Sequence, residues 1–99
     1  MADRVIWSPL AEKDLDEILN YLIINWNTHT TIKFLDKIEK VITQILKNPN
    51  QFPLVNKGLE IRKCVVTKHN TLFYRSHDNI IHILRLYDVR QNPDKLMFE

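Results

Sequence analysis

Three strand-like runs follow one another in residues 61–87, which read IRKCVVTKHNTLFYRSHDNIIHILRLY. Apolar, β-branched and aromatic residues dominate segments 61–67, 71–77 and 80–87, and this composition favours pleated, half-buried strands. The intervening segments, 68–70 and 77–79, are polar and short enough for hairpin turns. The sequence therefore predicts a three-stranded antiparallel meander.

The predicted meander is also rich in positive charge. The whole chain carries 14 Lys and Arg against 12 Asp and Glu, a net charge of only +2. Between residues 61 and 93 the cations are Arg62, Lys63, Lys68, Arg75, Arg85 and Arg90, and the acids are Asp78 and Asp88. Because a local excess of one charge attracts the opposite sign, we expect an anionic partner here. The alternative is a solvated charged face.

A strand and a long helix are predicted upstream of the meander. Residues 4–7 form a short apolar run with two β-branched members. Ser8 then suits an N-cap, and Pro9 suits the first helical position, where its missing N–H is harmless. Apolar residues recur at three- and four-residue spacing from there to Trp26, with polar residues between them. This pattern indicates an amphipathic helix.

A second helix of similar length is predicted after a short polar turn. Thr28 or Thr30 is its expected cap, and the apolar period continues over residues 35–46. The helix should end at Asn48, because the residue before a proline is disfavoured in the α region. Gly58, the only glycine, marks the expected turn into the meander, where a positive φ would carry no steric cost.

This order of elements predicts an α+β fold. An N-terminal strand, a helical hairpin and a C-terminal three-stranded meander imply an antiparallel sheet with both helices on one face. The other face is then half open, and cations can stand out from it. Arg62, Arg75 and Arg85 lie near one another if the strand register suits.

Length and composition describe one ordinary domain, residues 1–99. The 99 residues, 44% hydrophobic and 26% charged, suffice for one core. No apolar run reaches the roughly 18 residues of a membrane span, and the N-terminus lacks a secretory h-region. Cys64 is the only cysteine, so we expect a cytoplasmic protein without disulfides. The four histidines show no metal-ligand spacing, so neither a metal nor a cofactor is expected.

Two groups of residues are candidate sites. The first surrounds Arg62 and His69, and the second is segment 85–93 with Arg85, Tyr87 and Arg90. Arginine binds phosphate or carboxylate through two parallel hydrogen bonds, and a nearby Tyr or His can stack on a base or transfer a proton. Four further residues are expected to be structural, in the core or at a helix end: Trp7, Trp26, Cys64 and Tyr74.

Short motifs occur in order along the whole chain. They are WSPLA at 7–11, NP at 48–49, IRK at 61–63, LFYR at 72–75, IHIL at 81–84 and DVRQNP at 88–93. This ordered set resembles the RelE/ParE superfamily of toxins from type II toxin–antitoxin systems, often called plasmid stabilisation proteins.

What the resemblance implies is a small cytosolic toxin that is held inactive by a cognate antitoxin, within a toxin–antitoxin hetero-oligomer. RelE-like members cleave mRNA, commonly in the ribosomal A site and without a metal. They use a base, an acid and several cations around the scissile phosphate. ParE-like members instead poison DNA gyrase and need no such set of residues.

The chain matches the RelE-like nuclease pattern only in part. By the resemblance, Arg90 falls where RelE-like members carry a catalytic arginine, and Arg62 falls near one of their lysines. Three further positions of that pattern carry other residues, namely Cys64, Thr71 and Leu96. Tyr87 and His69 would have to substitute for the missing groups.

We therefore expect a ParE-like toxin that inhibits growth by poisoning DNA gyrase. The alternative is a RelE-like mRNA endonuclease, with Arg62, His69, Arg85, Tyr87 and Arg90 as its catalytic residues. A third possibility is a non-toxic binding module or a decayed toxin whose basic sheet docks an acidic partner.

Overall fold

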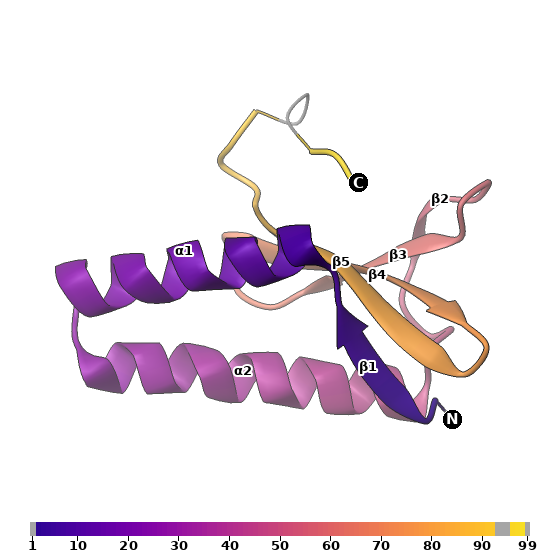
Figure 1. The fold of residues 1–99 in the computed structure, drawn as a ribbon, viewed down its shortest axis with the longest axis horizontal. Helices are drawn as coiled ribbons and strands as arrows, with labels where there is room; N and C mark the ends of the chain where they lie inside the picture. Colours follow the sequence, from indigo (N-terminus) through magenta and orange to yellow (C-terminus); the bar gives the residue numbers. More distant parts are fainter. Residues whose placement is uncertain (1, 93–95, 99) are drawn as a thin grey trace.

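Two helices pack on one face of a five-stranded sheet in the computed structural model, which describes residues 2–92 and 96–98 (Figure 1). The elements are β1 (Arg4–Trp7), α1 (Pro9–Asn25), α2 (Thr28–Lys47), β2 (Leu54–Asn56), β3 (Ile61–Val65), β4 (Asn70–His77) and β5 (Ile80–Asp88). The predicted α+β class, with a helical hairpin and a C-terminal meander, is confirmed. No helix among the described residues is long and apolar enough to cross a membrane.

The first helix begins as its sequence predicts. Pro9 is its first residue, and the Ser8 side chain accepts a hydrogen bond of 3.0 Å from the backbone N–H of Ala11. The hydroxyl of Ser8 also donates to the carbonyl of Leu84, at 2.9 Å. The N-cap of α1 therefore also joins the helix to β5.

The predicted cap of the second helix is wrong. Thr28 is already helical, and Asn27 is the N-cap, with its side chain accepting from the N–H of Thr30 at 2.8 Å. Asn27 has an extended backbone, which is the conformation that a capping side chain needs to reach back to the first turn. The predicted end of the helix is confirmed, because Asn48 is its C-cap.

The sheet has the strand order β1-β5-β4-β3-β2. Strands β3, β4 and β5 form the predicted antiparallel meander. The sheet as a whole is mixed and not purely antiparallel, because β1 pairs in parallel with β5, placing Arg4 opposite Ile80. Residues 54–56, which lie between the second helix and Gly58 and for which the sequence predicts no strand, form the edge strand β2 beside β3. All three residues of β2 are exposed, so no alternation of apolar and polar residues marked it in the sequence.

A positive φ at Gly58 was expected, and this expectation is wrong. The turn lies at residues 57–60 as predicted, but its positive φ, 55°, falls on Glu60. The side chain of Asn56 accepts from the N–H of Leu59 at 2.9 Å and so stabilises this turn. Asp78 and Asn79 both have positive φ, as a two-residue hairpin between β4 and β5 requires.

The apolar core has two parts, one on each face of the sheet. On the inner face, which packs on the helices, Tyr74 and Cys64 are buried as predicted. The Tyr74 hydroxyl donates to the carbonyl of Pro49 at 2.6 Å. On the outer face, a smaller cluster of buried residues packs against Leu84, Leu96 and Phe98; its members are Ile61, Phe73 and Tyr87.

For residues 94–99 the sequence after the Asn92-Pro93 pair predicts a short tail or a single helical turn. Residues 94, 95 and 99 lie outside the described residues, as does residue 93 of the last sequence motif. Residues 96–98 have no regular secondary structure, and Leu96 and Phe98 pack against the outer cluster.

Candidate functional site

A groove of about 680 Å³ lies between the two helices and the adjoining ends of β4 and β5. Helical residues form its apolar wall, which consists of Ile18, Tyr21, Leu22, Trp26 and Phe34. Its polar wall comes mainly from the start of β4, the end of β5 and the residues that flank them. Of the five candidate residues, His69, Arg85, Tyr87 and Arg90 line this groove and Arg62 does not.

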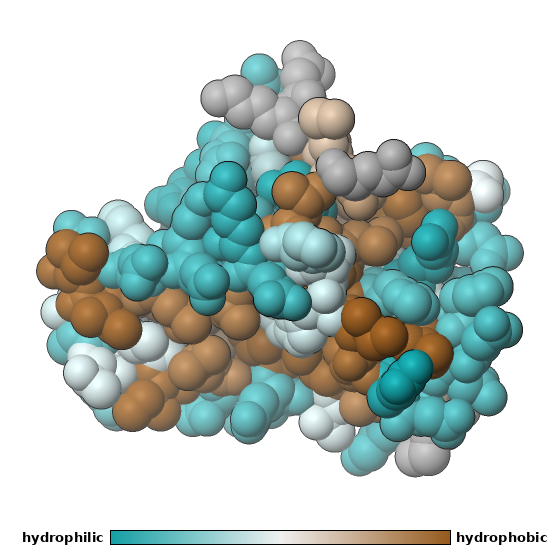
Figure 2. Space-filling model, viewed as in Figure 1, coloured by the Kyte–Doolittle hydropathy of each residue, from teal (hydrophilic) through white to brown (hydrophobic). Residues whose placement is uncertain are grey.

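The apolar wall continues onto the exposed end of the helical hairpin. Figure 2 shows hydrophobic side chains gathered at the end of the hairpin that projects beyond the sheet. Tyr21 is 56% exposed and Trp26 is 64% exposed, and both line the groove. Ile24, which does not line the groove, is 79% exposed. Large apolar surfaces of this kind mark sites of protein interaction.

Arg85 forms an ion pair with Asp14 of α1. Its Nε lies 2.7 Å from one carboxylate oxygen and its Nη2 lies 3.0 Å from the other, and each side chain is only 13% exposed. The hydrogen bond to Asp14 raises the pKa of Arg85 above its usual value. The same carboxylate accepts from the N–H of Leu86 at 3.0 Å, and Nη1 of Arg85 donates to the carbonyl of Met97 at 2.7 Å. These contacts make Arg85 a structural residue that ties α1 and the C-terminal segment to β5.

Arg90 forms a second ion pair, which is more exposed. Its guanidinium contacts both carboxylate oxygens of Asp88, with a shortest distance of 2.6 Å, and its side chain is 61% exposed. The hydrogen bond from Arg90 holds the pKa of Asp88 below its usual value. Because most of the Arg90 side chain faces solvent, a bound anion could still contact it.

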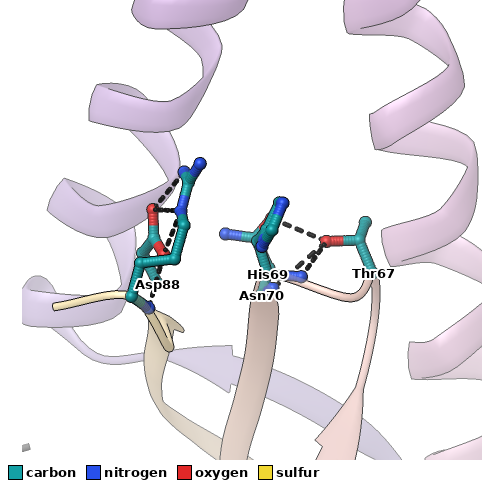
Figure 3. A network of polar contacts seen from close by, with 5 residues as sticks. Thr67, His69, Asn70 and Asp88 are labelled. Carbon is teal, nitrogen blue, oxygen red and sulfur yellow. Dashed lines mark hydrogen bonds and ion pairs between the residues drawn. The ribbon is translucent and has the colours of Figure 1, made fainter.

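His69 belongs to the turn between β3 and β4. Figure 3 shows His69 and Asn70 between Thr67 on one side and Asp88 on the other. The Thr67 hydroxyl accepts from the N–H groups of His69 and Asn70, at 3.2 and 3.1 Å, and donates to the Asn70 side chain at 2.8 Å. The carbonyl of His69 accepts from the N–H of Val89 at 2.8 Å. These bonds fix the turn beside the end of β5.

Tyr87 and Arg62 are both engaged in contacts within the fold. Tyr87 is buried, and its hydroxyl donates to the carbonyl of Asn92 at 2.6 Å. Arg62 donates to the carbonyls of Asn50 and Phe52, at 3.1 and 2.7 Å, and so fastens the loop between α2 and β2.

The predicted convergence of Arg62, Arg75 and Arg85 is not found. The register places Arg62 opposite the inner-face residue Tyr74. Since side chains alternate between the two faces, Arg75, the next residue after Tyr74, points to the outer face. Arg62 and Arg75 therefore lie on opposite faces of the sheet.

The sequence interpretation missed the contribution of α1. Asp14, Tyr21 and Trp26 all line the groove, but the sequence suggested a site role for none of them. One signal was present for the hairpin end: residues 18–26, ILNYLIINW, are apolar on more sides than a single buried stripe requires. No cluster of three or more His, Cys, Asp or Glu that could hold a metal ion occurs in residues 2–92 and 96–98.

Most of the groove residues that could act on RNA are engaged in contacts within the fold. Metal-independent cleavage needs a base, an acid and cations free to contact one phosphate. In the groove, Arg85 is paired with Asp14, and the Tyr87 hydroxyl is bonded to a backbone carbonyl. His69 and Arg90 are the remaining candidates, and Arg90 is itself paired with Asp88.

Comparisons with known proteins identify relatives of the chain. Residues 5–93 match a protein family described as the ParE toxin of the type II toxin–antitoxin system, parDE. No curated protein sequence matches the chain.

Several solved structures share the fold. A chain of the chromosomal ParDE toxin–antitoxin system from P. aeruginosa is 19% identical, with a TM-score of 0.73 over 89% of this chain and 96% of that chain. A chain of the YoeB-YefM complex from Staphylococcus aureus is 20% identical, with a TM-score of 0.61 over 84% and 92%. A metal-bound toxin from Helicobacter pylori is 19% identical, with a TM-score of 0.64 over 98% and 100%.

Proposed function

Because the chain belongs to the ParE toxin family of type II toxin–antitoxin systems, we propose that it arrests growth by inhibiting DNA gyrase and is neutralised by a cognate antitoxin. One observation carries the choice of gyrase over mRNA. The five residues that a nuclease would use do not form one site, because Arg62 lies outside the groove and Arg85 and Tyr87 are held by intramolecular contacts. A toxin that acts by binding a protein needs no such site.

A supercoiling assay tests this proposal directly. The purified protein, freed of antitoxin, is added to DNA gyrase and relaxed plasmid, and loss of supercoiled product is the expected result. In parallel, mRNA from cells in which the protein is induced is mapped for new breaks. Unaffected supercoiling together with rapid, codon-linked mRNA breaks would overturn the proposal.

The mRNA endonuclease is the second candidate, favoured by the presence of His69 and the exposed Arg90 in one groove. If these residues act on RNA, Arg90→Ala should abolish mRNA cleavage while antitoxin binding persists. Arg75→Ala is the matched control, because Arg75 is an exposed cation that does not line the groove. Normal growth despite abundant soluble protein would instead support a non-toxic binding module.

The groove is the proposed binding site of the antitoxin. Two of the similar structures are named as a toxin–antitoxin system and a complex, respectively. The apolar wall with Tyr21 and Trp26 suits the apolar face of an amphipathic segment. Such an antitoxin would act in the cytoplasm, where both gyrase and ribosomes are found.

The variant Trp26→Ala tests whether the antitoxin binds in the groove. The binding partner in this test is a candidate antitoxin encoded by a gene next to that of this protein. Loss of a large aromatic anchor should weaken antitoxin binding by about tenfold or more in isothermal titration calorimetry. Ile24→Ala removes a side chain that is still more exposed but lies outside the groove, so its affinity should stay unchanged. Equal affinity of the two variants for the antitoxin would mean that the antitoxin does not bind in the groove.

A further inference from the structure

Two residues of the groove wall are joined to the C-terminal segment, residues 96–98. Nη1 of Arg85 donates a hydrogen bond of 2.7 Å to the carbonyl of Met97. Tyr87 belongs to the outer cluster, on which two side chains of the segment pack. Arg85 and Tyr87 both line the groove, whereas residues 96–98 do not. The segment is therefore linked to the groove through residues of the groove wall.

An irregularity in β5 lets Arg85 reach in two directions. The register of β4 against β5 shifts at Leu84, which leaves this residue as a β-bulge, and a bulge redirects the side chains beside it. The pairing of β5 with β1 ends at Ile83. Arg85 therefore lies just past both the bulge and the end of that pairing. From this position its guanidinium contacts Asp14 of α1 and also the carbonyl of Met97.

Tyr87 is held by the chain that follows β5. Its hydroxyl donates to the carbonyl of Asn92 at 2.6 Å, and the centroid of its ring lies 5.5 Å from the guanidinium carbon of Arg85. In the same cluster the rings of Phe73 and Phe98 lie edge to face, with their centroids 5.4 Å apart. Without the C-terminal segment, Tyr87 would lose part of its apolar cover and Arg85 would lose one hydrogen bond. Both side chains would then have more conformations to lose when a partner binds, which weakens binding.

We propose that the C-terminal segment is a positioning device for the groove: by packing on the outer cluster, it holds Arg85 and Tyr87 in the conformation that the antitoxin binds. This inference rests on the proposed binding of the antitoxin in the groove, and it adds a role for residues that lie outside the groove. Because coupling between two equilibria is reciprocal, a bound antitoxin stabilises the packed segment by the same factor by which the packed segment strengthens antitoxin binding.

Isothermal titration calorimetry with the candidate antitoxin tests the proposal. The double alanine variant, Leu96→Ala with Phe98→Ala, removes the packing of the segment and should weaken antitoxin binding about fivefold or more. Met97→Ala is the matched control and should leave the affinity unchanged, because the side chain of Met97 is 62% exposed and its bond to Arg85 uses the backbone carbonyl. Leu96→Ile with Phe98→Tyr keeps one aliphatic and one aromatic side chain, so this variant should restore the affinity.

The variant Trp26→Ala, measured in parallel, separates two kinds of failure. If Trp26→Ala weakens antitoxin binding and the double alanine variant does not, the positioning role is overturned and the groove remains the antitoxin site. If neither variant changes the affinity, the groove assignment is overturned, and the positioning role with it. An equal loss of affinity in Met97→Ala would also overturn the positioning role, because that variant keeps both packing side chains.

A single variant and a second measurement decide the question if the double alanine variant does not fold. Phe98→Ala alone removes one ring contact and should still weaken antitoxin binding. In the unchanged protein, saturating antitoxin should reduce the exchange of the Phe98 ring NMR signals with the positions of an unstructured chain. An antitoxin affinity that ignores Phe98→Ala, or an exchange that ignores the antitoxin, would refute the coupling.

Discussion

Removal of Asp14 should destabilise the protein far more than its position on a surface helix suggests. Asp14→Ala leaves the guanidinium of Arg85, which is 13% exposed, without its carboxylate partner and leaves the N–H of Leu86 without its acceptor. Breaking a buried ion pair from one side costs about 3–5 kcal/mol. Since Arg85 keeps its bond to Met97, we expect a loss at the lower end, about 3 kcal/mol.

Urea denaturation followed by circular dichroism measures this loss. Because the free energy of unfolding of a small protein falls by about 1–3 kcal/mol per molar urea, the urea concentration at the unfolding midpoint should fall by about 1–3 M. Arg90→Ala is the matched control: it breaks the exposed pair with Asp88 and should leave the midpoint unchanged within error. Replacing both partners, Asp14→Leu with Arg85→Met, should recover part of the loss, because no unpaired charge remains.

Two results would refute this reasoning. The first is a loss below about 1 kcal/mol for Asp14→Ala, which would place the pair among ordinary surface ion pairs. The second is an equal fall in midpoint for Arg90→Ala, which would mean that exposure does not separate the two pairs.

Three further predictions follow from single contacts. Burial raises the pKa of Tyr74 to about 12, against about 10 in the unfolded chain. The contribution of Tyr74 to the free energy of unfolding is therefore fully present below pH 10, and about 2–3 kcal/mol of it should be lost as the pH rises to 12. In urea titrations, Tyr74→Phe should lose less stability than the unchanged protein over that pH range. Ser8→Ala should cost about 1–2 kcal/mol in the same assay, because the hydroxyl both caps α1 and bonds to β5, and Asn27→Ala, at an exposed cap, should cost less. Arg62→Ala should speed hydrogen exchange and proteolysis in the loop between α2 and β2 but leave toxicity intact; loss of toxicity in a folded variant would return Arg62 to the candidate site.

The individual elements were predictable because their signals are local. Ser8 and Pro9 mark the start of α1 by chemistry that needs no tertiary contact, and Asn48 before Pro49 marks the end of α2 in the same way. The error at the start of α2 has a local cause too. Asn27 and the threonines after it can all cap a helix, and only the backbone conformation selects among them.

The pairing of distant elements was not predictable in the same way. The parallel pairing of β1 with β5 depends on packing across the whole chain, and β2 has three exposed residues and hence no pattern. Dependence on distant parts of the chain also explains why the contacts of the candidate site residues were not predictable. Asp14 lies 71 positions before Arg85, so the sequence showed a free cation where the structure has an ion pair. Arg62 was grouped with the other arginines because its face depends on register, which the sequence leaves open.

The parallel pairing of β1 with β5 has a consequence for synthesis of the protein. Arg4 lies opposite Ile80, and the cap residue Ser8 bonds to a carbonyl 76 residues away. At about 5–20 residues per second, a ribosome needs several seconds to make the partner of a strand that it has already released. During that time β1 has no neighbour, and the polar wall of the groove does not yet exist. The groove proposed for the antitoxin therefore forms only after β5, the last strand in chain order, has been made.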